Sequence, residues 1–253
     1  EPLSIWIRGD FVVGDATLNR FFSFHVIAVP LVLLGLVAAH ILALHEVGSN
    51  NPDGVEIKKR KDVHGHPLDG IPFHPYYTVK DIVGVVVFLM VFSIIVFFAP
   101  EGGGYFLEYN NFLPADPLKT PLHIAPVWYF TPYYSLLRAM VWPLFGIDAK
   151  FWGVVAMGAG VVILAFLPWL DRSPVKSIRY RGPIFKTLLT IFVISFVILG
   201  FLGTQPPSYA FFGVIPSAPV AQVLSAYYFL YFLTMPWWSK IDKYKPEPDR
   251  VTM

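Results

Sequence analysis

Five long apolar stretches constrain this chain of 253 residues more than any other feature of its sequence. A helix that crosses the hydrocarbon of a bilayer needs about 20 predominantly apolar residues, and each stretch is close to that length. The stretches cover residues 22–44, 82–99, 151–170, 184–202 and 220–238. The pattern predicts an all-α fold, a polytopic membrane helix bundle with five transmembrane helices.

The composition agrees with a membrane protein and excludes several other classes. Hydrophobic residues make up 55% of the chain and charged residues only 14%, whereas soluble domains carry about 25% charged residues. The net charge of +2 gives no electrostatic argument for nucleic acid as a partner. Because there is no Cys, disulfides, thiolate metal sites and haem attachment through Cys are excluded, and a metal has to use His or carboxylate ligands.

Lys and Arg are sorted between alternate connections of the expected spans. Fourteen of the 19 lie in residues 46–80, in residues 171–186 or in the tail after residue 238, and only five lie on the alternate side. Cytoplasmic connections of membrane proteins carry an excess of Lys and Arg. We therefore expect these three segments, including the C-terminus, to face the cytoplasm or its equivalent, and residues 100–150 to face the opposite, positive side.

The connection of residues 100–150 is long and is rich in Pro and aromatic residues. Connections longer than about 15 residues are usually functional. We expect a stiff structure at the membrane surface with short surface helices, one of them a surface or re-entrant helix at residues 133–145. The chain then divides into four segments, which are a positive-side segment with the first span (1–45), a cytoplasmic loop with the second span (46–99), the long connection (100–150), and three spans with a cytoplasmic tail (151–253).

Two histidines lie inside the first expected span. A histidine in the hydrocarbon is costly and indicates function by default, although one alone is as often hydrogen-bonded to a neighbouring helix. His25 and His40 are 15 residues apart, which corresponds to about 22 Å of rise and about 60° around the axis of a regular helix. One helix thus presents an imidazole near each side of the bilayer, as two stacked haems need, and Pro30 between them is expected to bend the helix.

Several long motifs resemble cytochrome b, the haem- and quinone-binding subunit of quinol:cytochrome c oxidoreductases of the bacterial type. FFSFHVIAVPLVLLGLVAAHILALHEVGSNNPDG resembles the second haem-ligand helix of that family, and IPFHPYYTVKDI (residues 71–82) resembles its quinone-site segment. PADPLKTPLHIAPVWYF (residues 114–130) resembles its quinol-oxidation loop, and GTQPP (residues 203–207) extends the likeness toward the last span.

The resemblance implies two b-type haems. His25 would ligate the iron of the low-potential haem on the positive side, and His40 that of the high-potential haem on the negative side. The spacing of 15 differs from the 14 usual in mitochondrial members. Because the family's other haem ligands lie on an earlier helix, we expect this chain to be a C-terminal portion that begins just before the second haem-ligand helix. A missing N-terminal half, on the same polypeptide or a separate one, would supply the second axial ligands.

The resemblance also implies a quinone-reduction site on the negative side. His45 and Asp81 look like direct quinone ligands, and Ser49 and Asn50 look like wall residues. Quinone reduction takes up protons, which Asp81 and Lys80 could relay from the cytoplasm. From the residues alone, Lys80 is as well explained as an interfacial charge at a helix end.

A quinol-oxidation pocket is implied on the positive side. Its residues by resemblance are Pro126, Val127, Trp128, Tyr129 and Tyr134. Aromatic walls suit a flat quinone ring, although membranes also favour Trp and Tyr at their interfaces for other reasons.

Val127 departs from the Pro-Glu-Trp-Tyr motif of the family. The family's Glu is assigned to bind quinol or carry its proton, and Val can do neither. Proton exit then needs another route, such as a water chain, Tyr129 or a haem propionate, with His123 as a weaker candidate.

The resemblance implies a respiratory enzyme subunit that carries electrons between the two quinone sites and couples this transfer to proton translocation. Tyr129, Tyr134 and Asp81 are the candidate catalytic residues, and ubiquinone and ubiquinol the expected quinones. Expected partners are the Rieske iron–sulfur protein, cytochrome c1, a second copy of the complex and the lipid bilayer. The expected location is a bacterial inner membrane or, alternatively, the mitochondrial inner membrane.

A haem-free proton-relay transporter and a structural membrane anchor are the competing functions. The first predicts ionisable groups inside several spans, and the second leaves His25 and His40 unexplained.

Overall fold

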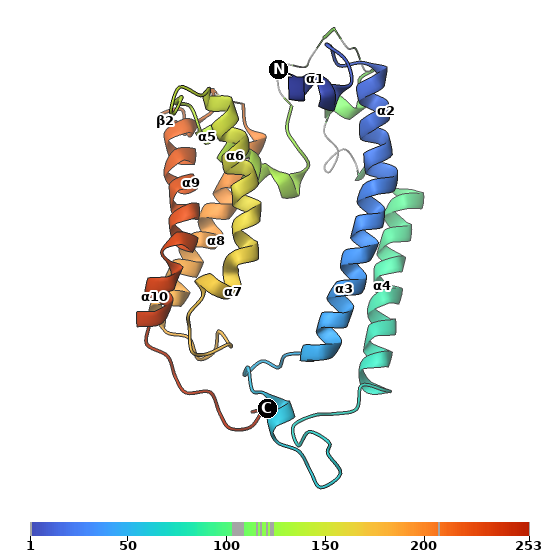
Figure 1. Cartoon of the computed structure of the whole chain (residues 1–253), viewed down its shortest axis with the longest axis vertical. Coiled ribbons are helices and arrows are strands. Elements are labelled where there is room, and N and C mark those ends of the chain that lie inside the picture. The colour runs from blue at the N-terminus through green and yellow to red at the C-terminus, as the bar shows by residue number, and fades with distance from the viewer. Residues whose placement is uncertain are drawn as a thin grey trace. The chain divides into compact units, whose positions relative to one another are not determined.

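The computed structural model describes residues 2–102, 109–114, 116, 118, 119, 121, 124–206 and 208–252. Contacts divide the chain into two units. The first unit comprises Glu1–Asn51 and Leu113–Leu122, and the second comprises Pro52–Phe112 and His123–Met253. Helices dominate both units (Figure 1), and a two-stranded antiparallel pair, β1 (Ala210–Phe211) with β2 (Ile215–Pro216), lies in the second.

The first unit contains the first expected span. After the short helix α1 (Pro2–Arg8), the chain turns into α2 (Asp15–Ser23), a π-helical turn η1 (Phe24–Ala28) and α3 (Val29–Val47). Together α2, η1 and α3 form 33 consecutive helical residues, Asp15–Val47 (Figure 1). The side chain of Arg20 donates a hydrogen bond to the carbonyl oxygen of Trp6 and so ties α2 to α1. The sequence thus forms a helix long enough to cross a bilayer.

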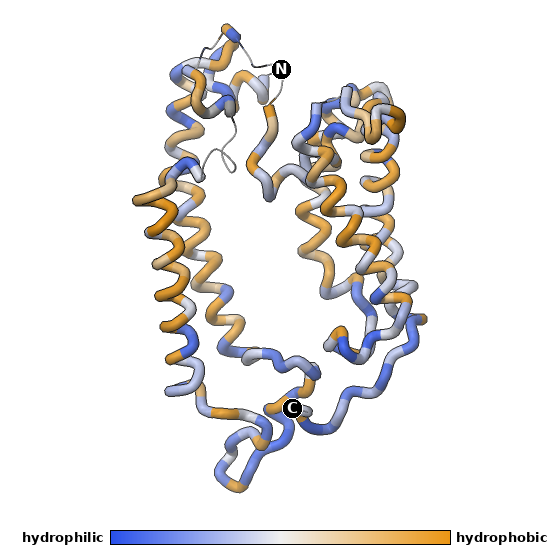
Figure 2. The backbone as a smooth tube through the Cα atoms, turned by 180° about the vertical axis from the view of Figure 1, so that it is seen from behind, coloured by the Kyte–Doolittle hydropathy of each residue, from blue (hydrophilic) through white to orange (hydrophobic). Residues whose placement is uncertain are grey.

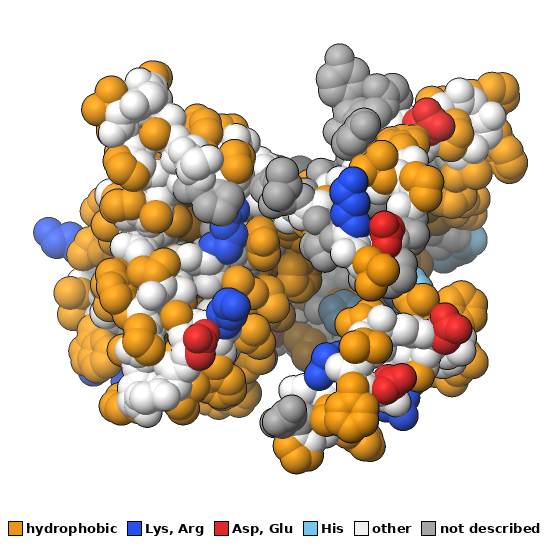
Figure 3. Space-filling view, turned by 90° about the horizontal axis from the view of Figure 1, so that it is seen from above, with side chains coloured by type: hydrophobic (Ala, Val, Ile, Leu, Met, Phe, Trp, Pro, Cys, Tyr) orange, Lys and Arg blue, Asp and Glu red, His pale blue; other side chains and the backbone are white. Residues whose placement is uncertain are grey.

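The second expected span is α4 (Tyr76–Phe98) in the second unit. Nearly every side chain of α4 is exposed in the isolated chain, and Figure 2 colours the helix mostly hydrophobic. Figure 3 shows hydrophobic side chains over much of the face seen from above. Exposure of so much apolar surface to water is unfavourable, so lipid or other protein has to cover these faces.

The remaining spans form a helix bundle in the second unit. The third span runs through α6 (Ala149–Val162), the 3-10 turn η6 (Ile163–Phe166) and α7 (Leu167–Leu170), and the fourth is α8 (Pro183–Thr204). The fifth differs from the single helix expected. It comprises α9 (Ser217–Leu233) and α10 (Met235–Ile241), which meet at an angle of 62°. Pro236 lies at the start of α10, and a proline lacks the N–H that would continue the hydrogen-bond ladder of α9.

The described helices therefore include four clear membrane-spanning candidates, or five when the bent pair α9 and α10 counts as one span. This agrees with the predicted polytopic helical bundle. The long connection contributes the predicted short helices, which are η4 (Tyr109–Phe112), η5 (Trp128–Phe130) and α5 (Thr131–Ala139).

Helix α5 is shorter and more buried than the surface helix expected at residues 133–145. It packs against α6, α8 and α9, and the side chain of Leu136 is 1% exposed. Ser135 Oγ donates a 2.6 Å hydrogen bond to the carbonyl oxygen of Leu199 in α8. A Cβ at Gly203 would lie 2.1 Å from the carbonyl oxygen of Thr131, so the close approach of α5 to α8 requires glycine there.

Aromatic side chains fill the core of this bundle. Phe192 of α8 stacks on Tyr231 of α9 with ring centroids 4.5 Å apart. The ring centroids of Tyr231 and Trp238 of α10 are 5.3 Å apart. The hydroxyl of buried Tyr228 donates to the carbonyl oxygen of Gly160 at 2.7 Å, which satisfies its polar atom within the core. The bundle therefore supports α5, the helix of the long connection that packs against it.

Candidate functional site

His25 and His40 lie on the spanning helix of the first unit. His25 is inside the π turn η1, and His40 is in α3. Both imidazoles are exposed, and neither makes a hydrogen bond to another described residue. An imidazole without a competing partner can coordinate a metal through one ring nitrogen. Both side chains are thus accessible, and their role as haem ligands stays a prediction.

His45, Ser49 and Asn50 lie where the same span ends. His45 is in the last turn of α3, and Ser49 and Asn50 follow Gly48, whose φ of 84° ends the helix. All three predicted residues are exposed. The structure thus brings these polar side chains to one end of the span.

Lys80 and Asp81 lie near the start of α4, in the second unit. Both are exposed, and the ammonium of Lys80 lies 5.5 Å from the ring centroid of Tyr77, one helical turn earlier. Such contacts of a cation with an aromatic face are weak at exposed sites. His45 and Asp81 belong to different units, and their predicted pairing stays a prediction.

The predicted aromatic pocket residues cluster around η5. The rings of Trp128 and Tyr129 meet edge to face with centroids 5.5 Å apart, and Thr131 Oγ1 caps the turn by donating to the carbonyl oxygen of Trp128 at 2.7 Å. Pro126 is half-buried, and the side chain of Val127 is 55% exposed. The weaker candidate His123 lies outside the described residues.

Tyr134 lies one turn into α5, beside a cation that sequence reasoning left unassigned. The guanidinium carbon of Arg138 lies 5.5 Å from the ring centroid of Tyr134. Arg138 Nη1 donates a 2.8 Å hydrogen bond to the carbonyl oxygen of Gln205. A cavity of about 300 Å³ opens beside Arg138 and Ser135. The signal for Arg138 in the sequence is its position as a charge inside an apolar stretch.

Asp53 is a second residue that the sequence did not single out. Its side chain is 0% exposed. It accepts hydrogen bonds from the Tyr180 hydroxyl at 2.8 Å and from Arg179 Nη1 at 3.1 Å. The backbone N–H of Thr252 and its hydroxyl add bonds of 2.8 and 2.9 Å. These bonds, that of Tyr180 first among them, lower the pKa of Asp53 to about 2, and the bond to Asp53 raises the pKa of the Tyr180 hydroxyl above its ordinary value.

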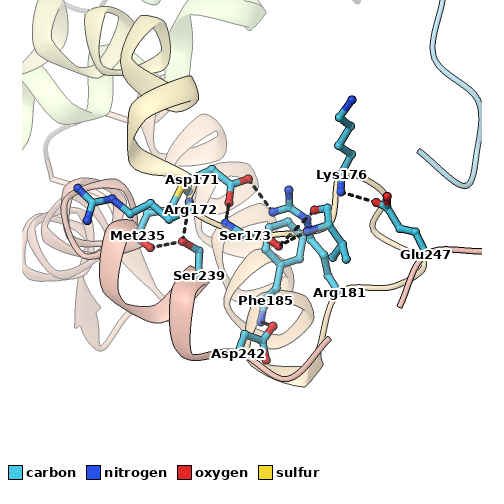
Figure 4. A network of polar contacts seen from close by, with 11 residues as sticks. Asp171, Arg172, Ser173, Lys176, Arg181, Phe185, Met235, Ser239, Asp242 and Glu247 are labelled. Carbon is cyan, nitrogen blue, oxygen red and sulfur yellow. Dashed lines mark hydrogen bonds and ion pairs between the residues drawn. The ribbon is translucent and has the colours of Figure 1, made fainter. Parts of the chain in front are cut away.

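Further polar contacts join the same segments of the second unit (Figure 4). Asp171 pairs with Arg181 at 2.7 Å, and the backbone N–H of Lys176 donates to Glu247 at 2.7 Å. The carboxylate of Asp242 accepts from the N–H groups at the start of α8, where carboxylates are favoured. Hydrogen bonds thus join the connections rich in Lys and Arg to the C-terminal tail.

Comparison with known proteins relates this arrangement to one family. Residues 1–132 match the family described as "Cytochrome b(N-terminal)/b6/petB". Residues 114–229 match "Cytochrome b(C-terminal)/b6/petD". The chain belongs to the cytochrome b family.

Bacterial cytochromes b match 96% or more of the chain. It is 58% identical to cytochrome b of Allochromatium vinosum over 100% of its length and 59% of that protein. It is 41% identical to cytochrome b of Rickettsia typhi, with 99% of this chain and 57% of that protein covered. It is 44% identical to cytochrome b of Rhodospirillum rubrum, with 96% of this chain and 54% of that protein covered. The chain thus spans less than two thirds of these relatives.

The matches correct one expectation about the chain. It was expected to be a C-terminal portion of cytochrome b, yet residues 1–132 match the N-terminal description. The two matches overlap at residues 114–132, so the division between the two parts lies in the long connection and not before the first span. The match likewise gives no support to a missing N-terminal half as a partner.

Membership of the cytochrome b family implies binding of haem b, and the residues present fit that group. Within the described parts of the chain, no three His, Cys, Asp or Glu side chains converge as a site for a bare metal ion. A haem iron needs only axial ligands from the protein, because the porphyrin supplies the others. His25 and His40 each offer one such exposed imidazole.

Proposed function

We propose that this chain is the haem- and quinone-binding part of a quinol:cytochrome c oxidoreductase. The observation that carries the proposal is the pair His25 and His40 on one spanning helix of a cytochrome b family member. Each imidazole would ligate the iron of a different b-type haem, that of low potential at His25 and that of high potential at His40. Bound haem b would supply one-electron redox chemistry, and His25 and His40 would each hold one of the irons.

On the positive side, the proposed quinol-oxidation pocket is formed by residues around η5. The edge-to-face pair of Trp128 and Tyr129 provides flat aromatic walls. Tyr129 and Tyr134 provide hydroxyls that can accept or donate a proton in a hydrogen bond. Pro126 and Val127 would complete the apolar wall. Because Val127 cannot accept a proton, another group would have to carry the proton released from quinol.

On the negative side, the proposed quinone-reduction site combines residues from the ends of two spans. His45 and Asp81 would hydrogen-bond the quinone carbonyls, and Ser49 and Asn50 would line the pocket. An imidazole titrates near physiological pH and so can supply a proton during reduction. Lys80 and Asp81 would pass protons from the aqueous phase, with ubiquinone as the proposed substrate.

The proposed partners and location follow from this function. The electron acceptor on the positive side would be a Rieske iron–sulfur protein, followed by cytochrome c1, in a complex that is itself dimeric. The uneven distribution of Lys and Arg supports a C-terminus on the cytoplasmic side of a bacterial inner membrane. The bare apolar surfaces of α3 and α4 agree with lipid and partner contacts.

Visible redox spectra of membranes that contain the complex test the proposal. We expect His25→Leu and His40→Leu each to remove one b-type haem, with a different midpoint potential lost in each variant. His64→Leu, at an exposed position in the connection between α3 and α4, is the matched control and should keep both haems. Retention of both haems with unchanged potentials in His25→Leu and His40→Leu would contradict the proposal.

A further inference from the structure

The π turn η1 separates the two proposed haem ligands from regular helical spacing. It covers Phe24–Ala28, and the backbone N–H of Val29 donates to the carbonyl oxygen of Phe24, five residues back. An α-helix bonds four residues back, so this turn holds one additional residue. His25 lies inside the turn, and His40 lies in regular helix beyond it.

The additional residue changes the angle between the two imidazoles. In a regular helix, His25 and His40 are about 60° apart around the axis. An additional residue held in a π turn removes about 100° of rotation. The angle between the two imidazoles would then change from about +60° to about −40°. Because His25 lies within the turn, its direction falls between these limits, which include perfect alignment.

The sequence explains why the wide turn forms at this place. Pro30 lies in the second position of α3. In a regular helix, its ring would collide with the carbonyl group four residues earlier, at Val26, and its nitrogen could not donate to that group. Val26 lies in the middle of η1. The turn widens where the proline disfavours a regular α-helical turn, one residue after His25.

We infer that the π turn sets the rotational register of His25 against His40, so that both imidazoles leave the helix from one face. This inference rests on the proposed function, because it concerns the two proposed haem ligands. Phe24–Ala28 acts as a positioning segment, and it accommodates a histidine spacing of 15 on a helix whose fourth turn closes after about 14 residues.

A deletion and an insertion, compared in the complete complex, test the register. Deletion of Ile27 combined with Pro30→Ala removes both the additional residue and the proline that disfavours a regular turn. The helix can then close into regular α-helix with the histidines 14 residues and about 40° apart. Insertion of one Ala after Leu33 keeps the π turn and rotates His40 by about 100° relative to His25. We expect the deletion variant to keep both b-type haem bands and the insertion variant to lose at least one.

The measurements are the redox spectrum, the low-spin haem signals in electron paramagnetic resonance, and the amount of protein in the membrane by immunoblot. The inference would be overturned if the deletion variant lost a haem. It would also be overturned if the deletion variant were absent from the membrane while the His25→Leu variant was present there. Retention of both haems after the insertion would overturn it as well.

The histidine variants separate this inference from the proposed function. If His25→Leu and His40→Leu keep both haems, the proposed function fails and the register inference falls with it. If each loses one haem while the deletion variant also loses one, the haem ligands are correct and only the inference about the π turn is wrong.

Discussion

The buried carboxylate of Asp53 accepts a 2.8 Å hydrogen bond from the hydroxyl of Tyr180, 127 residues later in the chain. The same carboxylate accepts two bonds from Thr252, close to the end of the chain. Asp53 therefore joins the connection after the first span, the connection before α8 and the C-terminal tail. These are the segments expected on the cytoplasmic side, and Asp53 holds them together through its charge.

Replacement of Asp53 by Asn should release the C-terminal tail. The amide keeps the size of the side chain but removes the charge opposite Arg179, and its NH₂ group cannot accept the bonds of Thr252. Removal of one partner from a buried charged network is strongly destabilising. We expect limited proteolysis to cleave residues 243–252 faster in the variant. Asp249→Asn is the matched control, because Asp249 is 87% exposed in its ion pair with Arg60. Equal cleavage rates in the two variants would contradict the role of Asp53.

The same network gives a defined response to acid. The pKa of Asp53 is lowered from 3.8 to about 2 by its hydrogen bonds. A carboxyl with a lowered pKa stabilises the folded state above its unfolded pKa and loses that contribution as the pH falls through the folded value. We therefore expect the tail to stay attached at pH 4 and above and to be released between about pH 4 and pH 2. Pepsin digestion across this range measures the release, and the step should be missing in Asp53→Asn. A step centred well above pH 4 would assign the release to another group.

Hydropathy and charge predicted the architecture because a membrane imposes them directly on the sequence. A spanning helix has to be apolar over a fixed length, so the first four spans were found, the third and fourth with ends within two residues of those of the structure. The first two helices begin six to seven residues earlier than predicted. The bend between α9 and α10 was not predicted. Membrane helices tolerate proline because neighbours can satisfy the freed backbone groups, so Pro236 alone does not reveal a broken helix.

The π turn and the Asp53 network show where sequence reasoning stops. Residues 24–28 are mostly apolar, and apolar residues fit a π turn and an α-helix equally well, so hydropathy cannot detect η1. The network depends on contacts between residues more than 120 positions apart. No local pattern marks Asp53 as buried, because its surroundings form only after the helices have packed.

Replacement of Asp81 by Asn should slow quinone reduction on the negative side and leave both haems bound. Asp81 is an exposed carboxylate at the start of α4, and Asn can hydrogen-bond but cannot exchange a proton. The loss of one proton-transferring group typically costs about 10²–10⁴ in rate. The measurement is reduction of the high-potential haem through the negative-side site, with positive-side oxidation blocked. Asp62→Asn, in the connection between α3 and α4, is the control. An unchanged rate in Asp81→Asn would remove Asp81 from the proton path.

Replacement of Val127 by Glu tests whether the native loop is a working quinol-oxidation site. The family motif places a carboxylate at this position, and here an isopropyl group occupies it. We expect the native protein to be active, because Pro126, Trp128, Tyr129 and Tyr134 retain the aromatic walls and hydroxyls. The proposed iron–sulfur partner would supply a further hydrogen-bonding group.

The Glu should therefore change the rate only modestly and mainly alter its pH dependence, since a carboxyl in an apolar pocket has a raised pKa. Steady-state quinol:cytochrome c reduction across pH measures both effects, and Val127→Gln is the control that adds polarity without a titrating group. An increase of about a hundredfold or more on addition of Glu, equal to about 2.7 kcal/mol of barrier, would mean that the native pocket lacks an indispensable proton carrier. The proposed activity of the native loop would then be wrong, while the haem ligands on the first span would be unaffected.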